Sequence, residues 1–290
     1  MNTNNIIKIF SSCAFVVLLI ISSCSSAPKV TGDIVTLRNQ AERLLESGNK
    51  EATRGNFENA LGLLTESRRN AILADDPSLI IRVGLSRGNV LLSLGRTDEA
   101  YTEWNQAIAE AQRFRNSELL SLCRIYITRG NLVTRRSSEQ SVLDEVIRES
   151  GNLRSNRLFI AFSWQVRALA LRSLERWQEA EDASRRSLEI HESENILENA
   201  SYDWFVIASI RSLSGNIQGA IQALEASIAL DRRVENYWGL AASWRAMGDV
   251  YRKAGRNEEA MEVYTRAREI YIAMGNKHEV DETERRMRNL

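Results

Sequence analysis

The sequence is poor in the residues from which most active sites are built. Its 290 residues include only two histidines, three cysteines and two prolines, and its 38 basic residues balance 38 acidic ones. Without a net charge the chain has no overall field to attract nucleic acid, so we expect no nucleic-acid partner. Proline breaks helices because it lacks an N–H donor, and none follows Pro77, so helix is permitted over nearly the whole chain.

No combination of residues in the chain suggests catalysis. His191 and His278 are far apart and stand in polar stretches, so we expect two solvated surface histidines. No glycine-rich phosphate loop, closely spaced cysteine pair or His-x-x-x-His spacing occurs. Cys123, next to Leu122, is expected to be a small buried hydrophobic residue rather than a nucleophile. We therefore expect no enzyme, no cofactor and no metal site.

The first residues have the pattern of a secretory signal. Lys8 supplies a positive charge, and residues 13–21, CAFVVLLII, form an apolar run that is too short to span a membrane. The sequence Ile21-Ser22-Ser23-Cys24 follows, and it resembles the lipobox of bacterial lipoproteins. An ordinary secretory signal with a coincidental cysteine is the alternative.

The lipobox resemblance implies how the chain would be anchored. Residues 1–23 would be a cleaved lipoprotein signal peptide, and Cys24 would carry acyl chains such as palmitate and become the new N-terminus. Residues 24–33 are then interpreted as the lipidated cysteine and a flexible tether. Ser25, in place of an aspartate, resembles the enterobacterial sorting signal for the outer membrane. We therefore expect a lipoprotein of the bacterial cell envelope that faces the periplasm.

One short pattern returns along the chain at nearly constant spacing. It reads GRTDEA at 95–100 and GRNEEA at 255–260, with looser copies between and before them. A weaker copy, with Gly130 and Val142 in the third unit, gives spacings of 40, 42, 38, 40 and 40. A period of this size marks an array of stacked repeats. The alanines in register are Ala60, Ala100, Ala180, Ala220 and Ala260.

Each unit has the composition of a helical hairpin. A small residue, such as Gly88, precedes the alanine by twelve positions, and in four units a glycine precedes it by five, where it can end a helix. Apolar residues return at helical spacing and no window alternates as a strand would, so we expect an all-α fold. Large residues are expected to fill the space between helices, and they recur at two positions: Trp164, Trp204 and Trp244 at one, Leu64, Trp104, Val146, Leu224 and Tyr264 at the other.

The last unit resembles the tetratricopeptide repeat. Trp244, Met247, Gly248 and Tyr251 follow that family's W-x2-L-G-x2-Y pattern with methionine for leucine, and its later alanine and aromatic residue come next. The resemblance extends over about residues 38–275 and is poor in the third unit. It implies an α-solenoid of about six antiparallel helix pairs in a right-handed superhelix, with a repeat domain at 34–277 and a polar capping helix at 278–290. The unit exceeds the family's usual length of about 34 residues, which implies longer helices.

In the tetratricopeptide family the first helix of each unit lines a concave groove that receives peptides or partner helices. The resemblance therefore implies a protein or peptide partner in the groove. Amides in the early units could pair with a peptide backbone, and arginines could hold a carboxylate, which is similar to the family's carboxylate clamp without its paired lysines. The alternative is ordinary packing between helices. The candidates are Asn49, Arg82, Asn89, Arg124, Asn131, Phe162, Tyr202, Phe205, Arg245 and Arg252.

These features predict a membrane-anchored, non-catalytic adaptor or scaffold in cell-envelope assembly or transport. One alternative is a small-ligand or solute-transport accessory with an apolar pocket in units four to six. Another is a self-assembling structural lipoprotein, and a homo-oligomer is left open. Because the third unit departs from the common spacing and has Ser137 where others have glycine, we expect a bend there.

Overall fold

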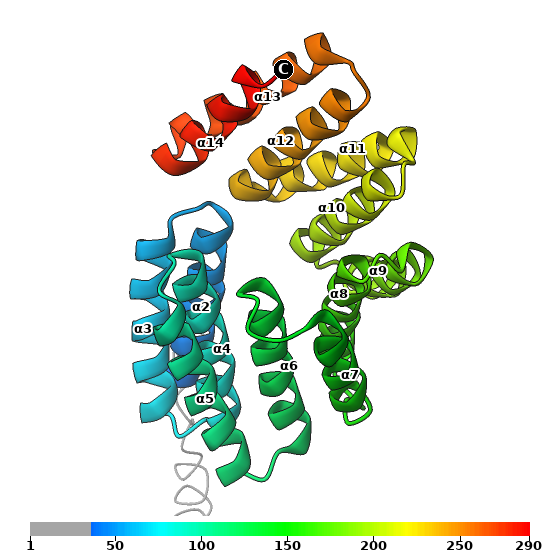
Figure 1. The fold of residues 1–290 in the computed structure, drawn as a ribbon. Coiled ribbons are helices and arrows are strands. Elements are labelled where there is room, and N and C mark those ends of the chain that lie inside the picture. The colour runs from blue at the N-terminus through cyan, green and yellow to red at the C-terminus, as the bar shows by residue number, and fades with distance from the viewer. Residues whose placement is uncertain (1–35) are drawn as a thin grey trace, which may run out of the picture. The chain divides into compact units, whose positions relative to one another are not determined.

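The computed structural model describes residues 36–290, and Leu37–Leu290 form one compact unit. The signal peptide, Cys24 and the tether predicted for residues 1–33 lie outside the described residues. Within residues 36–290 every regular element is an α-helix, as Figure 1 shows. The thirteen helices of this part of the chain confirm the all-α repeat fold.

Twelve of these helices pair in chain order as six hairpins that stack on one another (Figure 1). The first helices of the hairpins are α2 (Leu37–Thr53), α4 (Pro77–Ser93), α6 (Ser117–Val133), α8 (Arg157–Ser173), α10 (Leu197–Leu213) and α12 (Tyr237–Lys253). The second helices are α3 (Phe57–Leu73), α5 (Thr97–Arg113), α7 (Glu139–Ser150), α9 (Trp177–Ser193), α11 (Ile217–Val234) and α13 (Asn257–Ala273). The last helix, α14 (Lys277–Arg288), packs on α13.

The spacing of the hairpins is more regular than the sequence pattern suggests. Their first helices begin at a constant interval along the whole array, from Leu37 to Tyr237. The sequence pattern aligned Gly130 with Gly88 and so gave the third unit a spacing of 42 residues. That spacing is wrong for the first helix of the third hairpin, α6, which begins 40 residues after α4. Two extra residues lie in the turn that follows, and α7 has only 12 residues where α5 has 17. In the correct register, Arg129 and not Asn131 takes the place of Asn89.

The turns confirm this register. Gly55, Gly95, Gly215 and Gly255 adopt the left-handed conformation, with φ between 72° and 91°, as the glycine pattern predicts for helix ends. In the third hairpin this conformation belongs to Arg135, at φ 56°. Arg135, rather than Ser137, thus stands where four other hairpins have glycine and the fourth hairpin has Glu175, and the extra residues come after it. A residue with a side chain is strained in this conformation, which glycine tolerates.

Inside a hairpin, a small residue of the first helix faces a large residue of the second. A Cβ added to Gly88 would lie 2.1 Å from Nε1 of Trp104, and one added to Gly248 would lie 2.4 Å from Cε1 of Tyr264. Trp104 and Tyr264 are completely buried. The glycines therefore allow the two helices to approach until the large ring fills the space between them.

The other recurring tryptophans are less buried than expected. Trp164, Trp204 and Trp244 are only partly buried and lie at the edges of the apolar clusters. The guanidinium groups of Arg167 and Arg186 lie 5.0 and 4.6 Å from the centre of the Trp164 ring. The arginine side chains therefore cover part of a ring that the core leaves open.

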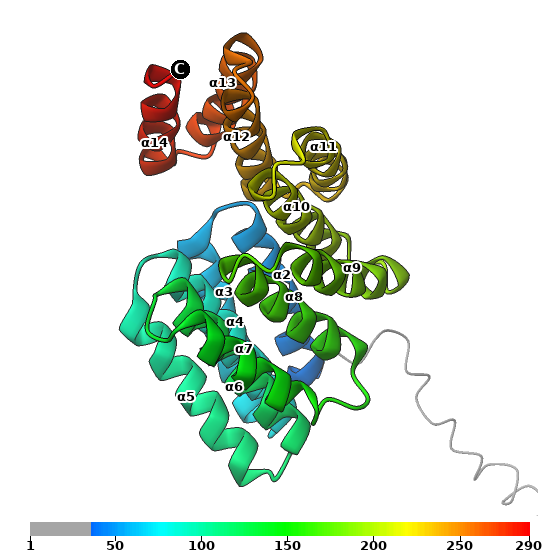
Figure 2. The ribbon, with the colours of Figure 1, turned by 45° about the vertical axis from the view of Figure 1, so that its right-hand side comes forward.

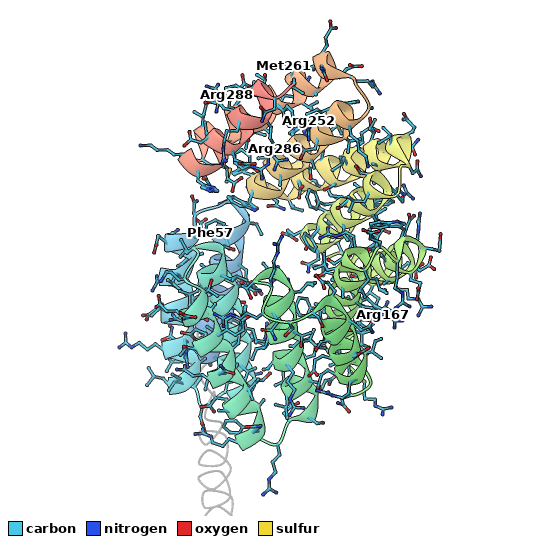
Figure 3. All side chains as sticks on the ribbon, viewed as in Figure 1. Phe57, Arg167, Arg252, Met261, Arg286 and Arg288 are labelled. Carbon is cyan, nitrogen blue, oxygen red and sulfur yellow. The ribbon has the colours of Figure 1, made fainter. Side chains whose placement is uncertain are left out.

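The first hairpin also contacts the end of the array. The rings of Phe57, at the start of α3, and Trp238, at the start of α12, meet edge to face with their centres 5.2 Å apart. Arg54 forms an ion pair with Glu235 beside them. The α2–α3 turn therefore lies against the start of α12 in both views (Figures 1 and 2), and Figure 3 labels Phe57 at this point. The curved row of hairpins thus closes on itself within Leu37–Leu290.

Candidate functional site

A cavity of about 560 Å³ lies inside the closed row of hairpins. Residues from the first helices of all six hairpins line it, together with residues at the start of α3 and on α11. This volume is in the range of sites that bind small molecules or short peptide segments. We call it the central cavity.

Aromatic side chains form one part of its wall. Phe162, Tyr202 and Phe205, which the sequence suggested as a groove patch, all line the central cavity. Phe162 packs against Tyr126 with their ring centres 4.4 Å apart, and Tyr202 stacks on Phe205 at 6.4 Å. Sequence reasoning missed Tyr126 and Trp238, which reach the cavity from α6 and α12.

Amide groups and a single arginine form a second part of the cavity wall. Asn89 lines the cavity as predicted, and its Oδ1 lies 3.4 Å from Nη1 of Arg129 on α6. Among the described residues, Arg129 is the one basic residue in the cavity wall. The sequence pattern placed Asn131 at this point because the third unit was set two residues out of register; the constant spacing of the first helices identifies Arg129 instead.

Two acidic residues form a third part of the cavity wall, on the side made by α10 and α11. Glu198 lies in the first turn of α10, and Asp231, near the end of α11, is only 1% exposed. Oδ1 of Asp231 accepts a hydrogen bond of 2.7 Å from Nδ2 of Asn236, but its Oδ2 is buried without a partner. Burial raises the pKa of Asp231 to about 6, and the charge of Glu198 adds to the effect.

Three serine hydroxyls lie beside Asp231. Ser201, Ser227 and Ser243 form a chain in which neighbouring Oγ atoms are 3.0 Å apart. The hydroxyls of Ser201 and Ser227 oppose the rise in the pKa of Asp231, but burial outweighs them. The floor of the cavity is therefore polar beneath its aromatic wall.

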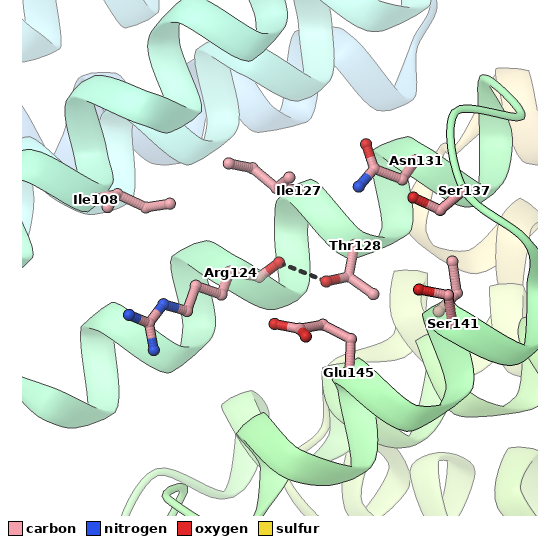
Figure 4. Close-up of a pocket in the computed structure, with 9 residues that line it drawn as sticks. Ile108, Arg124, Ile127, Thr128, Asn131, Ser137, Ser141 and Glu145 are labelled. Carbon is pink, nitrogen blue, oxygen red and sulfur yellow. Dashed lines mark hydrogen bonds between the residues drawn. The ribbon is translucent and has the colours of Figure 1, made fainter.

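Arg124 and Asn131 lie in a different and smaller cavity. It has a volume of about 290 Å³ between α5, α6 and α7, and Figure 4 shows both residues on α6, with Glu145 on the neighbouring α7. Nη1 of Arg124 is 3.2 Å from Oε1 of the buried Glu149, and Oδ1 of Asn131 accepts a hydrogen bond of 2.8 Å from Tyr101. Both predicted residues thus serve contacts between helices.

The remaining candidates lie outside the central cavity. Asn49 is exposed on α2, and Arg82 on α4 has its guanidinium 3.9 Å from Glu42. Arg245 on α12 forms an ion pair with Glu279 of α14. Arg252 is exposed on α12, as Figure 3 shows. The structure therefore does not gather the proposed arginines into one carboxylate clamp.

His191 was expected on the surface, and that expectation is wrong. It is 1% exposed, and its Nδ1 lies 2.6 Å from Oδ2 of Asp203, which also accepts a hydrogen bond from Gln165. Ser187 lies 3.4 Å from the same nitrogen. In a catalytic triad the serine and the carboxylate use opposite nitrogens of the ring, so this group is a buried polar contact between hairpins. His278 is exposed, as expected.

The thiol of Cys123 is buried on α6, as the sequence predicted. Burial raises its pKa to about 12, so the reactive thiolate is not formed near neutral pH. Among residues 36–290, no group of three or more histidine, cysteine, aspartate or glutamate side chains could hold a metal ion. None of the helices in that range is both long and apolar enough to cross a bilayer.

Comparison with known proteins agrees with this architecture. The tetratricopeptide repeat matches the sequence at residues 199–273. The matched residues include most of α10 and all of α11, α12 and α13, so the match agrees with the helical-repeat fold of this part of the chain. No curated protein sequence matches it significantly.

Several solved structures share the fold at low sequence identity. BtubC (BKLC) from P. vanneervenii is 17% identical with a TM-score of 0.54, and the match covers 82% of this chain and 93% of that one. A Rap protein complexed with the competence and sporulation factor is 16% identical with a TM-score of 0.58, over 86% and 74% of the two chains. The Rap conjugation gene regulator of the plasmid pLS20, in complex with a peptide, is 15% identical with a TM-score of 0.63, over 87% and 66%.

Proposed function

We propose that this protein is a non-catalytic adaptor that binds a peptide, or an extended segment of a partner protein, in the central cavity. The observation that carries the proposal is the single cavity lined by the first helices of all six hairpins. Its aromatic wall can hold apolar side chains, and its amides can pair with backbone groups. The absence of a reactive thiol at Cys123 and the buried position of His191 favour binding over catalysis.

Two structures of similar fold are complexes with a bound ligand. The Rap protein holds the competence and sporulation factor, and the Rap conjugation gene regulator holds a peptide. At 16% and 15% identity they bear on the fold alone. The chemistry of the cavity wall therefore carries the proposal for this chain.

Filling the central cavity should weaken peptide binding. Ala242 of α12 lines the cavity and is partly buried, so the change Ala242→Trp places an indole where a peptide would lie. We expect binding to peptides selected from an array of random octapeptides to weaken by about tenfold or more, because the ligand would have to displace the ring.

The matched control is Ala109→Trp, which adds the same ring at an exposed position of α5 away from the cavity. The control should bind as the unchanged protein does. Equal binding by both variants would place the peptide elsewhere on the molecule. An array that yields no peptide, together with stable self-association, would favour the structural lipoprotein.

We also propose that the chain is a lipoprotein of the bacterial outer membrane that faces the periplasm, anchored through Cys24. The support is the run CAFVVLLII followed by Ile21-Ser22-Ser23-Cys24. The change Cys24→Ser should move the protein from the membrane fraction to the soluble fraction and abolish labelling by an alkyne analogue of palmitate. Undiminished labelling of the variant would rule out this anchor. A cell-envelope role in assembly or transport rests on the same proposal.

A further inference from the structure

The acidic side of the central cavity contains charge without a counter-ion. Glu198 and Asp231 lie close enough for the charge of one to disfavour that of the other, and neither forms an ion pair among the described residues. Oδ2 of Asp231 is buried and has no partner in hydrogen-bonding geometry, although the Ser201 and Ser227 hydroxyls lie near enough to oppose the rise in the pKa of this carboxyl. The basic residue of the described wall, Arg129, is on α6 with its guanidinium at Asn89. A buried carboxylate in this situation is costly unless a cation joins it.

The repeat itself shows how this site differs from its neighbour. Asp231 of α11 takes the same position in its hairpin as His191 of α9 takes in the preceding one. His191 faces a charged partner, Asp203, on the following first helix. The residue of α12 equivalent to Asp203 is Ser243, which bonds to Ser227 rather than to Asp231. The chain therefore supplies a partner to His191 and supplies none to Oδ2 of Asp231.

Aromatic rings lie beside the two carboxylates. Glu198, Tyr202 and Phe205 are spaced four and three residues apart on α10, so they share one face of the helix, and all three line the cavity. Aromatic faces attract organic cations and pack against their apolar stems. A ligand that suits this side of the cavity has a positive nitrogen next to an apolar or aromatic group.

We propose that the central cavity selects a peptide with a basic group, whose positive nitrogen binds at Asp231 and Glu198 while its stem packs on Tyr202 and Phe205. The nitrogen belongs to an amino terminus or to a lysine or arginine side chain. This inference rests on the proposed peptide-binding function and adds the charge of the ligand to it. Gly239 of α12 lies directly beside the carboxylate, because a Cβ added to it would be 2.8 Å from Oδ1 and 2.9 Å from Oδ2 of Asp231.

The test compares the charge preference of three proteins on one array of random octapeptides, presented with free and with acetylated amino termini. The unchanged protein should select peptides with lysine, arginine or a free amino terminus. The double variant Glu198→Gln/Asp231→Asn keeps the shape of both side chains. Its preference for basic over uncharged peptides should be about tenfold weaker than that of the unchanged protein. The matched control, Asp182→Asn/Glu189→Gln on the exposed face of α9, removes the same two charges away from the cavity and should retain that preference.

A second measurement separates a failure of this inference from a failure of the proposed function. Propylguanidinium at millimolar concentration should raise the melting temperature of the unchanged protein more than propylurea, its uncharged counterpart, and the double variant should show no difference. Selected peptides without a preference for basic groups, or a preference that the double variant retains, would overturn the inference and leave peptide binding intact. If no peptide binds but propylguanidinium acts as expected, the cation site stands and the peptide function falls. If both measurements are negative, neither proposal stands.

Discussion

Changing Trp104 to alanine should lower the free energy of unfolding by about 3–5 kcal/mol. The indole is completely buried between α4, α5 and α6, and it fills the space beside both Gly88 and Gly130. Its Nε1 also donates a hydrogen bond of 3.3 Å to the carbonyl of Leu85. Alanine would leave a cavity that two glycines cannot fill, so little relaxation is available to recover the loss. Urea denaturation followed by circular dichroism measures the change.

The matched control for this prediction is Trp164→Ala. Trp164 is only partly buried and borders a surface pocket, so its removal exposes a surface that water already reaches. We expect it to cost less than half as much as Trp104→Ala. Hydrogen exchange should place the loss from Trp104→Ala in α4, α5 and α6, because these three helices surround the indole. Equal losses from the two variants would contradict the assignment of Trp104 as the main packing residue of the second hairpin.

The sequence predicted the hairpins well because their pattern is local. A small residue in one helix and a large residue in the next must recur wherever two helices meet at the same distance, as Gly88 and Trp104 do. The register of the third hairpin was harder, because its left-handed turn residue is Arg135 rather than glycine. Without that marker the two extra residues of the turn were assigned to the preceding helix.

The candidate site was predicted only in part, and the reason is physical. Asn89, Phe162, Tyr202 and Phe205 lie on first helices, so their common face follows from the repeat. Whether such faces form a long groove or surround one central cavity depends on the small rotation between successive hairpins, summed over the array. No local pattern encodes that sum. The contact of Phe57 with Trp238, which closes the row, therefore appears only in the structure.

The buried polar residues could have been found from the repeat register. In four of the other hairpins the position of His191 is occupied by Ala71, Ala111, Asp231 and Tyr271, and the last two of these carry polar side-chain atoms. All four residues are buried. The repeat position therefore predicts a buried histidine, although its sequence neighbours are polar. The polar composition of the residues around His191 wrongly predicted that its side chain is exposed.

Changing Asp231 to asparagine should make the protein more stable at pH 7, by about 2–3 kcal/mol. Burial raises the pKa of Asp231 from 3.8 in the unfolded chain to about 6 in the folded protein. Between about pH 4 and pH 6 the folded protein therefore binds more protons than the unfolded one, so stability contributed by this group falls as pH rises through that range. The asparagine variant does not titrate there. The two proteins should be equally stable near pH 4 and diverge as the pH rises to 7, as urea denaturation at each pH would show.

The same substitution at Asp203 should have the opposite effect. Burial also raises the pKa of Asp203, but both of its oxygens have hydrogen-bond partners: Oδ1 accepts from Gln165, and Oδ2 lies 2.6 Å from Nδ1 of His191. Asparagine keeps one acceptor and turns a donor toward one of these partners, so we expect a loss of about 1–3 kcal/mol. If burial alone decided the outcome, both variants would gain stability at pH 7. Opposite signs would show that the missing partner at Oδ2 is what makes Asp231 costly, and the unliganded cavity then retains a carboxylate whose cost a bound cation can offset.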